Sequence, residues 1–163
     1  MMKQLILMRH GKSSWEHEVS DKERPLQQRG VDDAHRVGST FLEKGPAVDF
    51  IFSSPANRAL HTCLIFMGET GHPKDRFKVD GALYDFSGES VKGFVEQLDD
   101  RLATVAIFGH NNAFTSLANS WGDRYIENLP TAGLVHIIFD GDRWSTISKG
   151  RTEQLLVPKH LNK

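Results

Sequence analysis

The stretch LILMRHGKS, residues 5–13, decides how the rest of the chain is interpreted. Its first four residues form a short apolar run, typical of a buried strand, and that run stops at Arg9 and His10. Ligands of open α/β sheets bind beyond the carboxyl ends of the strands, so a guanidinium and an imidazole at this point indicate a functional loop. The tripeptide Arg9-His10-Gly11 can also arise by chance, so the other strand ends have to be compared with it.

Strand and helix signals alternate along the rest of the chain. Short apolar runs predict strands at residues 5–8, 48–52, 77–79 and 104–108. Apolar residues at helical spacing predict helices over about 26–44, 55–70, 90–101 and 112–121, the second capped by Ser54. Two final runs, 134–139 and 144–147, flank the turn at 140–143 and predict an antiparallel hairpin. This order predicts a three-layer α/β/α sandwich whose central sheet is mostly parallel, with an antiparallel edge.

Composition bounds the classes of function. The chain has 163 residues, 39% of them hydrophobic and 25% charged, and we expect one domain over residues 1–163. A net charge of −1 gives no indication of nucleic acid or an anionic membrane as a partner. The apolar run near the N-terminus is too short for a signal peptide or a membrane span, so a cytoplasmic location is expected. The one cysteine, Cys63, lies in an apolar stretch and is expected to be a buried thiol.

Three strand ends deliver cations and imidazoles to one edge of the predicted sheet. Arg9 and His10 follow the first strand, Arg58 follows the second, and His110 follows the strand at 104–108. Two guanidiniums bind a phosphate dianion through forked donors, and a neutral imidazole can attack phosphorus directly. His10 is therefore the candidate nucleophile, and His110 would donate hydrogen bonds to the phosphoryl oxygens. Because these side chains supply the positive charge, neither a metal ion nor another cofactor is expected.

The quoted segments resemble the signature of the histidine phosphatase superfamily, which has the phosphoglycerate-mutase-like fold. Residues 5–13 look like its first motif, SSPANRA at 53–59 resembles its second arginine motif, and Gly109-His110 matches its second histidine. The segment DKERPL at 21–26, followed by Arg29-Gly30, is similar to a segment of the SixA-like phosphohistidine phosphatases, and the short chain fits that branch.

The resemblance implies a role for each matching residue. His10 would be the phosphorylated nucleophile, and Arg9, Arg58 and His110 would complete the phosphate pocket. Ser13 falls where small polar residues often approach the phosphate in this family. The sequence leaves two roles open for Arg24, contact with the site or a surface salt bridge that fixes the loop.

The proton donor is less well defined by the sequence. Many members of the family carry an acidic residue after the third strand, and Asp85 falls near that place, with Glu89 as the neighbouring candidate. SixA-like members often lack a convincing acid. An alkoxide leaving group needs a proton, whereas an imidazole, with a pKa of about 6.5 once protonated, needs much less help. A marginal acid is therefore compatible with a phosphoramidate substrate.

The leading hypothesis is a phosphatase that forms a phosphohistidine intermediate on His10 and dephosphorylates phosphohistidine on a protein, such as a histidine phosphotransfer domain. One alternative is a small-molecule phosphomonoesterase of the same fold, acting on sugar phosphates or nucleotides. Another is a non-catalytic phosphate-binding scaffold. The short loop between the predicted helix that contains Asn57 and Ser87 leaves little material for a lid, so we expect an open, shallow site that suits a protein substrate.

Overall fold

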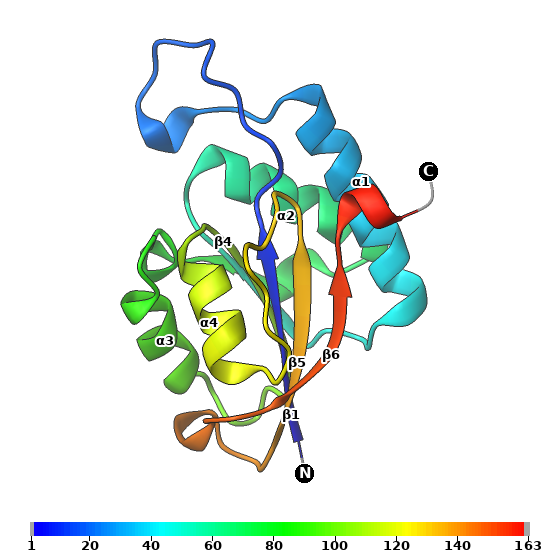
Figure 1. Ribbon diagram of the computed structural model, residues 1–163, viewed down its shortest axis with the longest axis vertical. Coiled ribbons are helices and arrows are strands. Elements are labelled where there is room, and N and C mark those ends of the chain that lie inside the picture. The colour runs from blue at the N-terminus through cyan, green and yellow to red at the C-terminus, as the bar shows by residue number, and fades with distance from the viewer. Residues whose placement is uncertain (1, 162–163) are drawn as a thin grey trace.

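A six-stranded mixed sheet forms the centre of this computed structural model, which describes residues 2–161 (Figure 1). The strands lie in the order β3-β2-β4-β1-β5-β6. Their bounds are β1 Met2–Arg9, β2 Phe50–Ser53, β3 Phe77–Val79, β4 Thr104–Gly109, β5 Leu134–Asp140 and β6 Arg151–Leu156. The first four strands in this order pair in parallel, and β5 and β6 add an antiparallel edge. The predicted sheet type is confirmed.

Helices cover both faces of this sheet, so the predicted three-layer sandwich is also confirmed (Figure 1). Their bounds are α1 Gln28–Lys44, α2 Asn57–Thr70, α3 Glu89–Glu96 and α4 Ala113–Trp121. Within residues 2–161, 3-10 turns lie between these elements at Asp21–Glu23, Lys74–Arg76, Gly81–Leu83 and Trp144–Thr146, and a further one, Pro158–His160, follows β6. No helix among residues 2–161 is long and apolar enough to cross a membrane.

The central strand β1 shows why the sheet is covered on both sides. Leu5 and Leu7 join a core cluster with α3 and α4, while Ile6 and Met8 join a second cluster with α1 and α2. All four side chains are fully buried. Successive side chains of a strand point to opposite faces, so a continuous apolar run is what a strand between two helix layers requires. Cys63 of α2 is buried in the second cluster, as predicted.

The register of the parallel strands positions the candidate residues. Arg9 at the end of β1 lies beside Gly109 at the end of β4, and Ser53 of β2 lies beside Phe108. The three strands therefore end at the same level, and the residues that follow them leave the sheet side by side. One backbone hydrogen bond, from His10 N to Gly109 O at 3.1 Å, continues the ladder into these loops.

The first strand of the predicted C-terminal hairpin is confirmed, and the second is wrong. Leu134–Asp140 is a strand, but its antiparallel partner is β6, and residues 144–146 form a 3-10 turn instead. Trp144 is fully buried and its indole Nε1 donates to Leu102 O at 2.8 Å, so this segment folds under the end of the sheet. The polar sequence RTEQLL of β6 belongs to an exposed edge strand, which gives little hydrophobic signal.

Candidate active site

The structure brings together the four residues predicted to form a phosphate pocket. Arg9 and His10 lie at the end of β1, His110 follows β4, and Arg58 lies in the first turn of α2. The His10 and His110 ring centroids are 5.3 Å apart, and Arg58 Nε lies 3.4 Å from His10 Nε2. Arg9 Nη1 donates to Leu129 O at 2.8 Å, while its buried Nε has no partner among residues 2–161.

His10 is held in the form that a nucleophile needs. Its Nδ1 lies 2.7 Å from the carbonyl oxygen of Gly11, which can only accept, so the proton is on Nδ1 and the lone pair is on Nε2. Burial lowers the pKa of His10 to about 4, and the guanidiniums of Arg58, Arg9 and Arg24 act in the same direction against the hydrogen bond to Gly11. The imidazole is therefore neutral at pH 7, with Nε2 facing the guanidinium of Arg58.

Gly11 is required by the close approach of the nucleophile loop to α1. A Cβ at this position would lie 2.6 Å from the carbonyl oxygen of Gly30, a distance that no side chain tolerates. The Gly11 N–H donates to Thr62 Oγ1 of α2 at 3.0 Å, and the Ala132 N–H donates to His10 O at 2.8 Å. Contacts from three segments thus fix the backbone on either side of His10.

His110 is fully buried and shares a hydrogen bond with a serine that the sequence assigned elsewhere. Its Nε2 lies 2.8 Å from Ser54 Oγ, and its Nδ1 has no partner among residues 2–161. Burial lowers the pKa of His110 to about 3, and repulsion from His10 and Arg58 adds to this effect. Ser54 is not the N-cap of α2, because the helix begins at Asn57 after Ala56. It accepts from the Ala56 N–H at 3.2 Å and orients His110 instead.

Asp21 is a site residue that sequence reasoning did not single out. It accepts two hydrogen bonds from Arg58, at its backbone oxygen (2.6 Å) and at Oδ2 (2.9 Å). Tyr84 donates to the same Oδ2 at 2.6 Å, and Arg24 Nη1 donates to Oδ1 at 3.2 Å. Burial works against the charged carboxylate, but the hydrogen bonds from Tyr84 and Arg58 outweigh it and hold the pKa of Asp21 well below its ordinary value. Asp21 lies in the segment at 21–26, which the sequence indicated only through its resemblance to a segment of the SixA-like phosphatases.

The loop between β1 and α1, residues 10–27, contacts Arg58 through Asp21. Arg24 is buried in it and donates to Ser13 Oγ, Ser14 O and Asp21. Its guanidinium carbon also lies 3.3 Å from the ring centroid of Trp15, a residue that is 78% exposed. Arg24 is therefore a loop-fixing residue here, and Ser13 is its partner. His10 is 8% exposed and Arg58 2%, so little of either side chain reaches the surface.

The predicted acid, Asp85, serves as a cap at the start of α3. Its carboxylate accepts four hydrogen bonds of 3.0–3.1 Å, two from Ser87, one from the Gly88 N–H and one from the Val91 N–H. Burial opposes the charged form, but these bonds outweigh it and the pKa of Asp85 lies below its ordinary value. Glu89 is the exposed first residue of α3. The engaged carboxylate and the lowered pKa disfavour an acid role for Asp85 at neutral pH.

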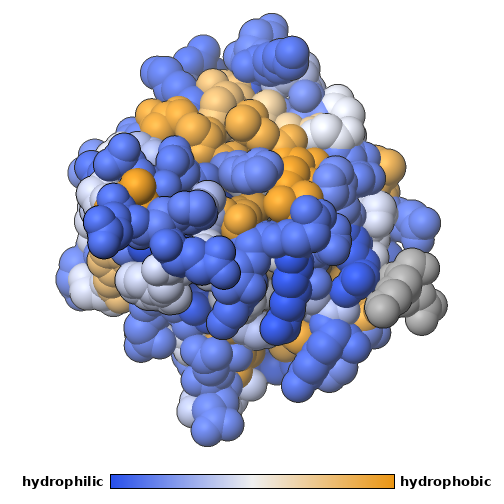
Figure 2. All heavy atoms as spheres, turned by 90° about the horizontal axis from the view of Figure 1, so that it is seen from above, coloured by the Kyte–Doolittle hydropathy of each residue, from blue (hydrophilic) through white to orange (hydrophobic). Residues whose placement is uncertain are grey.

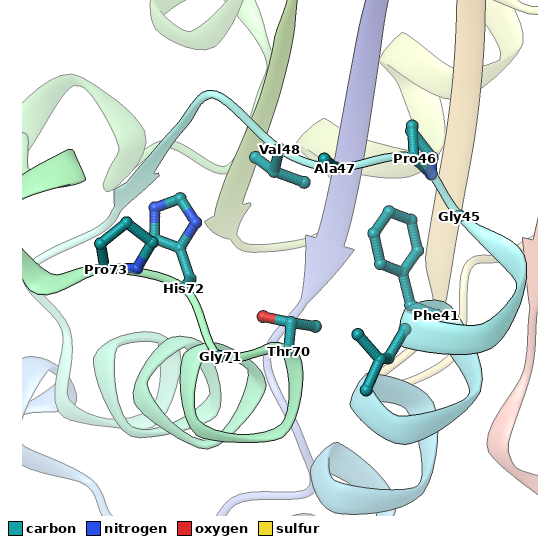
Figure 3. A pocket seen from close by; sticks show the side chains of 10 residues that line it. Phe41, Gly45, Pro46, Ala47, Val48, Thr70, Gly71, His72 and Pro73 are labelled. Carbon is teal, nitrogen blue, oxygen red and sulfur yellow. The ribbon is translucent and has the colours of Figure 1, made fainter.

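A hollow at the opposite end of the sheet lacks this chemistry (Figure 3). It has a volume of about 360 Å³ and lies between the C-terminal ends of α1 and α2 and the segment before β2. Its one imidazole, His72, bonds to Arg76 O, and its other lining residues are apolar or uncharged. Figure 2 looks down on the end of the molecule that carries the active-site loops, where polar residues cover most of the surface and an apolar patch lies to one side.

The arrangement at the strand ends suits a phosphoryl dianion. Arg9 and Arg58 provide guanidiniums in a protein whose overall charge is close to zero. The lone pair of His10 Nε2 points into the same space as Arg58 Nε, and the unpartnered Nδ1 of His110 can donate when it carries the proton. These groups can hold a phosphorus atom against a neutral nucleophile and stabilise the charge that develops on its oxygens.

Comparison with known proteins agrees with this chemistry. The sequence model of the histidine phosphatase superfamily (branch 1) matches residues 5–87. An uncharacterized protein of Mycobacterium tuberculosis is 27% identical over 153 residues, which cover 88% of this chain and 93% of that protein. A 2,3-bisphosphoglycerate-dependent phosphoglycerate mutase of Beijerinckia indica is 36% identical over 72 residues, 42% of this chain but only 35% of the mutase.

Solved structures share the whole fold at low identity. A putative phosphohistidine phosphatase SixA from Nakamurella multipartitia superimposes with a TM-score of 0.81 at 20% identity, covering 97% of each chain. The protein histidine phosphatase SixA in complex with tungstate gives a TM-score of 0.81 at 19% identity, covering 96% of this chain and 98% of that one. The resemblance seen in the sequence is therefore confirmed in the fold. With the family match spanning both Arg9-His10 and Arg58, the chain belongs to the histidine phosphatase superfamily, branch 1.

Proposed function

We propose that this enzyme removes the phosphoryl group from phosphohistidine on a protein, such as a histidine phosphotransfer domain, with His10 as the nucleophile. Membership of the superfamily supports phosphatase chemistry, and the proposal adds the substrate and the roles of the residues. The SixA structures that share the fold bear the names of phosphohistidine phosphatases, which supports the same substrate class.

The reaction proceeds in two displacements. First, His10 Nε2 attacks phosphorus, the P–N bond of the substrate breaks, and the departing imidazole takes its electron pair and a proton from solvent. Water then attacks the phosphorus on His10, the new P–N bond breaks, and inorganic phosphate leaves while the proton from water returns to solvent. Arg9, Arg58 and His110 stabilise the charge on the phosphoryl oxygens in both steps.

The observation that carries this substrate class is the engagement of Asp85 as a helix cap. A carboxylate that accepts four hydrogen bonds, with a lowered pKa, is a poor source of a proton at neutral pH. Asp21 is ionised for the same kind of reason. An imidazole needs little protonation to leave, whereas an alkoxide needs a full proton transfer. A site with ionised carboxylates therefore favours a P–N bond over an alkyl P–O bond.

A panel of substrates tests the proposal. Wild type should release phosphate from a phosphohistidine protein or peptide at a kcat/KM well above that for sugar phosphates and nucleotides. The His10→Ala variant should lose this activity, while His72→Ala, at the far end of α2, should retain it. Efficient turnover of sugar phosphates with no hydrolysis of phosphohistidine would replace this substrate by the small-molecule alternative. Wild-type activity in His10→Ala would remove His10 from the nucleophile role.

A second variant separates the two leaving groups. Asp85→Asn should weaken the cap of α3 but should not remove phosphohistidine hydrolysis, because the carboxylate supplies no proton in the proposed reaction. Asp80→Asn is the matched control, since Asp80 caps the neighbouring 3-10 turn through the Ala82 N–H. A loss of phosphohistidine hydrolysis in Asp85→Asn at neutral pH that is recovered at acidic pH, where solvent supplies the proton, would make Asp85 the acid and contradict the argument.

A further inference from the structure

Three aromatic rings form one wall of the candidate site, and two of them have no role in the proposed reaction. The Phe86 ring centroid lies 5.0 Å from that of His110 and 5.2 Å from that of Tyr84. Tyr84 lies 5.4 Å from His110 in an edge-on arrangement. His110 is fully buried and Phe86 is 45% exposed, so Phe86 lies nearer to the surface than His110.

The position of Phe86 is fixed by its neighbours on both sides. The preceding Asp85 anchors the loop to the start of α3 through the Gly88 and Val91 N–H groups. The backbone oxygen of Phe86 accepts from the Asn112 N–H at 3.1 Å, which ties it to the loop that carries His110. A single exposed apolar side chain is common on protein surfaces, but the backbone of this one is hydrogen-bonded to the loop that carries a phosphate-pocket residue.

The leaving group must pass close to this ring. In an in-line displacement the leaving atom lies opposite the attacking nitrogen, so the substrate side chain extends away from His10. The His10 and His110 ring centroids are 5.3 Å apart, so a phosphoryl group bound by both rings would lie next to each of them. A leaving group that extends outward from the phosphorus therefore reaches the level of Phe86, the outermost of the three rings.

We propose that Phe86 forms an aromatic subsite that stacks against the departing ring of the substrate, the imidazole of phosphohistidine. This inference rests on the proposed function and names the residue that selects its leaving group. Aromatic pairs are favourable at centroid separations of about 4.5–7 Å beyond the area that they bury. Asp85 then acts as a positioning residue, because its cap places the Phe86 loop against His110.

Paired substrates with and without a ring test the subsite. We expect Phe86→Leu to lower kcat/KM for a phosphohistidine peptide by about three- to tenfold. The same variant should change kcat/KM for a phospholysine peptide, which has a P–N bond but no ring, by less than about twofold. Phe86→Tyr should restore the wild-type value, and Tyr125→Leu, which removes an exposed aromatic ring of the loop after α4, should have no effect. Inhibition by vanadate should be unchanged in Phe86→Leu, which shows that the phosphate pocket is intact.

A second substrate pair separates failure of the subsite from failure of the proposed function. Phenyl phosphate and an alkyl phosphate differ in the ring of the leaving group while both carry a P–O bond. If wild type ignores phosphohistidine but Phe86→Leu selectively slows phenyl phosphate, the proposed substrate is wrong and the aromatic subsite stands. Equal losses for ring and non-ring substrates, or no loss for either, would overturn the subsite.

Discussion

Lowering the pH from 7 to 5 should reduce the free energy of unfolding through two imidazoles that are buried in their neutral form. Burial lowers the pKa of His10 to about 4 and that of His110 to about 3, whereas each has an ordinary pKa of about 6.5 in the unfolded chain. As the pH falls below 6.5, the unfolded chain binds protons that the folded protein does not bind. Stability is therefore lost from about pH 6.5 down to the folded pKa values.

The magnitude follows from these pKa values. Between pH 7 and pH 5 each imidazole contributes a loss of about 2 kcal/mol, and the pair contributes roughly 3–4 kcal/mol. A domain of this kind has a total free energy of unfolding of about 5–15 kcal/mol, so the loss is a large part of it. The loss stops growing below the folded pKa values, because the folded protein then binds the same protons.

Urea unfolding at pH 7 and pH 5 measures this effect. The difference in free energy between the two pH values should shrink by about 2 kcal/mol in His10→Gln and by a similar amount in His110→Gln. His61→Gln, which changes an exposed imidazole on α2, is the control and should leave the difference as in wild type. If both buried variants lose as much stability in acid as wild type does, the neutral burial of these imidazoles is refuted.

Three further predictions concern the loop contacts and the charge of the pocket. Asp21→Asn should lower kcat about tenfold, since Arg58 loses a charge-assisted partner, and should bring the pKa of Tyr84, which Asp21 raises, back toward its ordinary value in an ultraviolet titration. Gly11→Ala should lower the free energy of unfolding by about 1–3 kcal/mol because its Cβ meets the backbone of α1. Gly93→Ala is the control, because a Cβ at this position of α3 would meet no atom within 4 Å. In urea unfolding of both variants, Gly93→Ala should not lower the free energy of unfolding by this amount. Vanadate should inhibit phosphate release and EDTA should not, and loss of activity with EDTA would contradict a metal-independent reaction.

The sequence was sufficient to predict the fold class. It also predicted that four side chains lie together at one edge of the sheet, those of Arg9, His10, Arg58 and His110. A continuous apolar run at residues 5–8 requires helices on both faces of its strand, and parallel strands place their carboxyl ends at one edge. His10 and His110 therefore had to leave the sheet side by side, as the pairing of Arg9 with Gly109 shows. These predictions depend on local patterns and on one general rule of sheet topology, which is why they could be made.

Other contacts depend on segments that local patterns do not connect. Asp21 and Arg58 are separated by 37 positions in the chain, and their ion pair forms only because the loop after β1 folds over α2. The same folding buries Arg24, with its guanidinium against the ring of the exposed Trp15. No periodicity in the sequence indicates where such a loop lies.

Residues 5–13 by themselves predicted a strand and a functional loop, and the motifs at 53–59 and 109–110 added the family resemblance, because apolar periodicity and side-chain chemistry are local properties. Only the tertiary structure decided what the polar side chains around that loop do. Asp85 has the chemistry of an acid, but nearby N–H groups use its carboxylate as a helix cap. Ser54 has the chemistry of a cap, but it orients His110. A polar side chain can serve any of several partners, and the partner that lies within hydrogen-bond distance is set by the folded backbone.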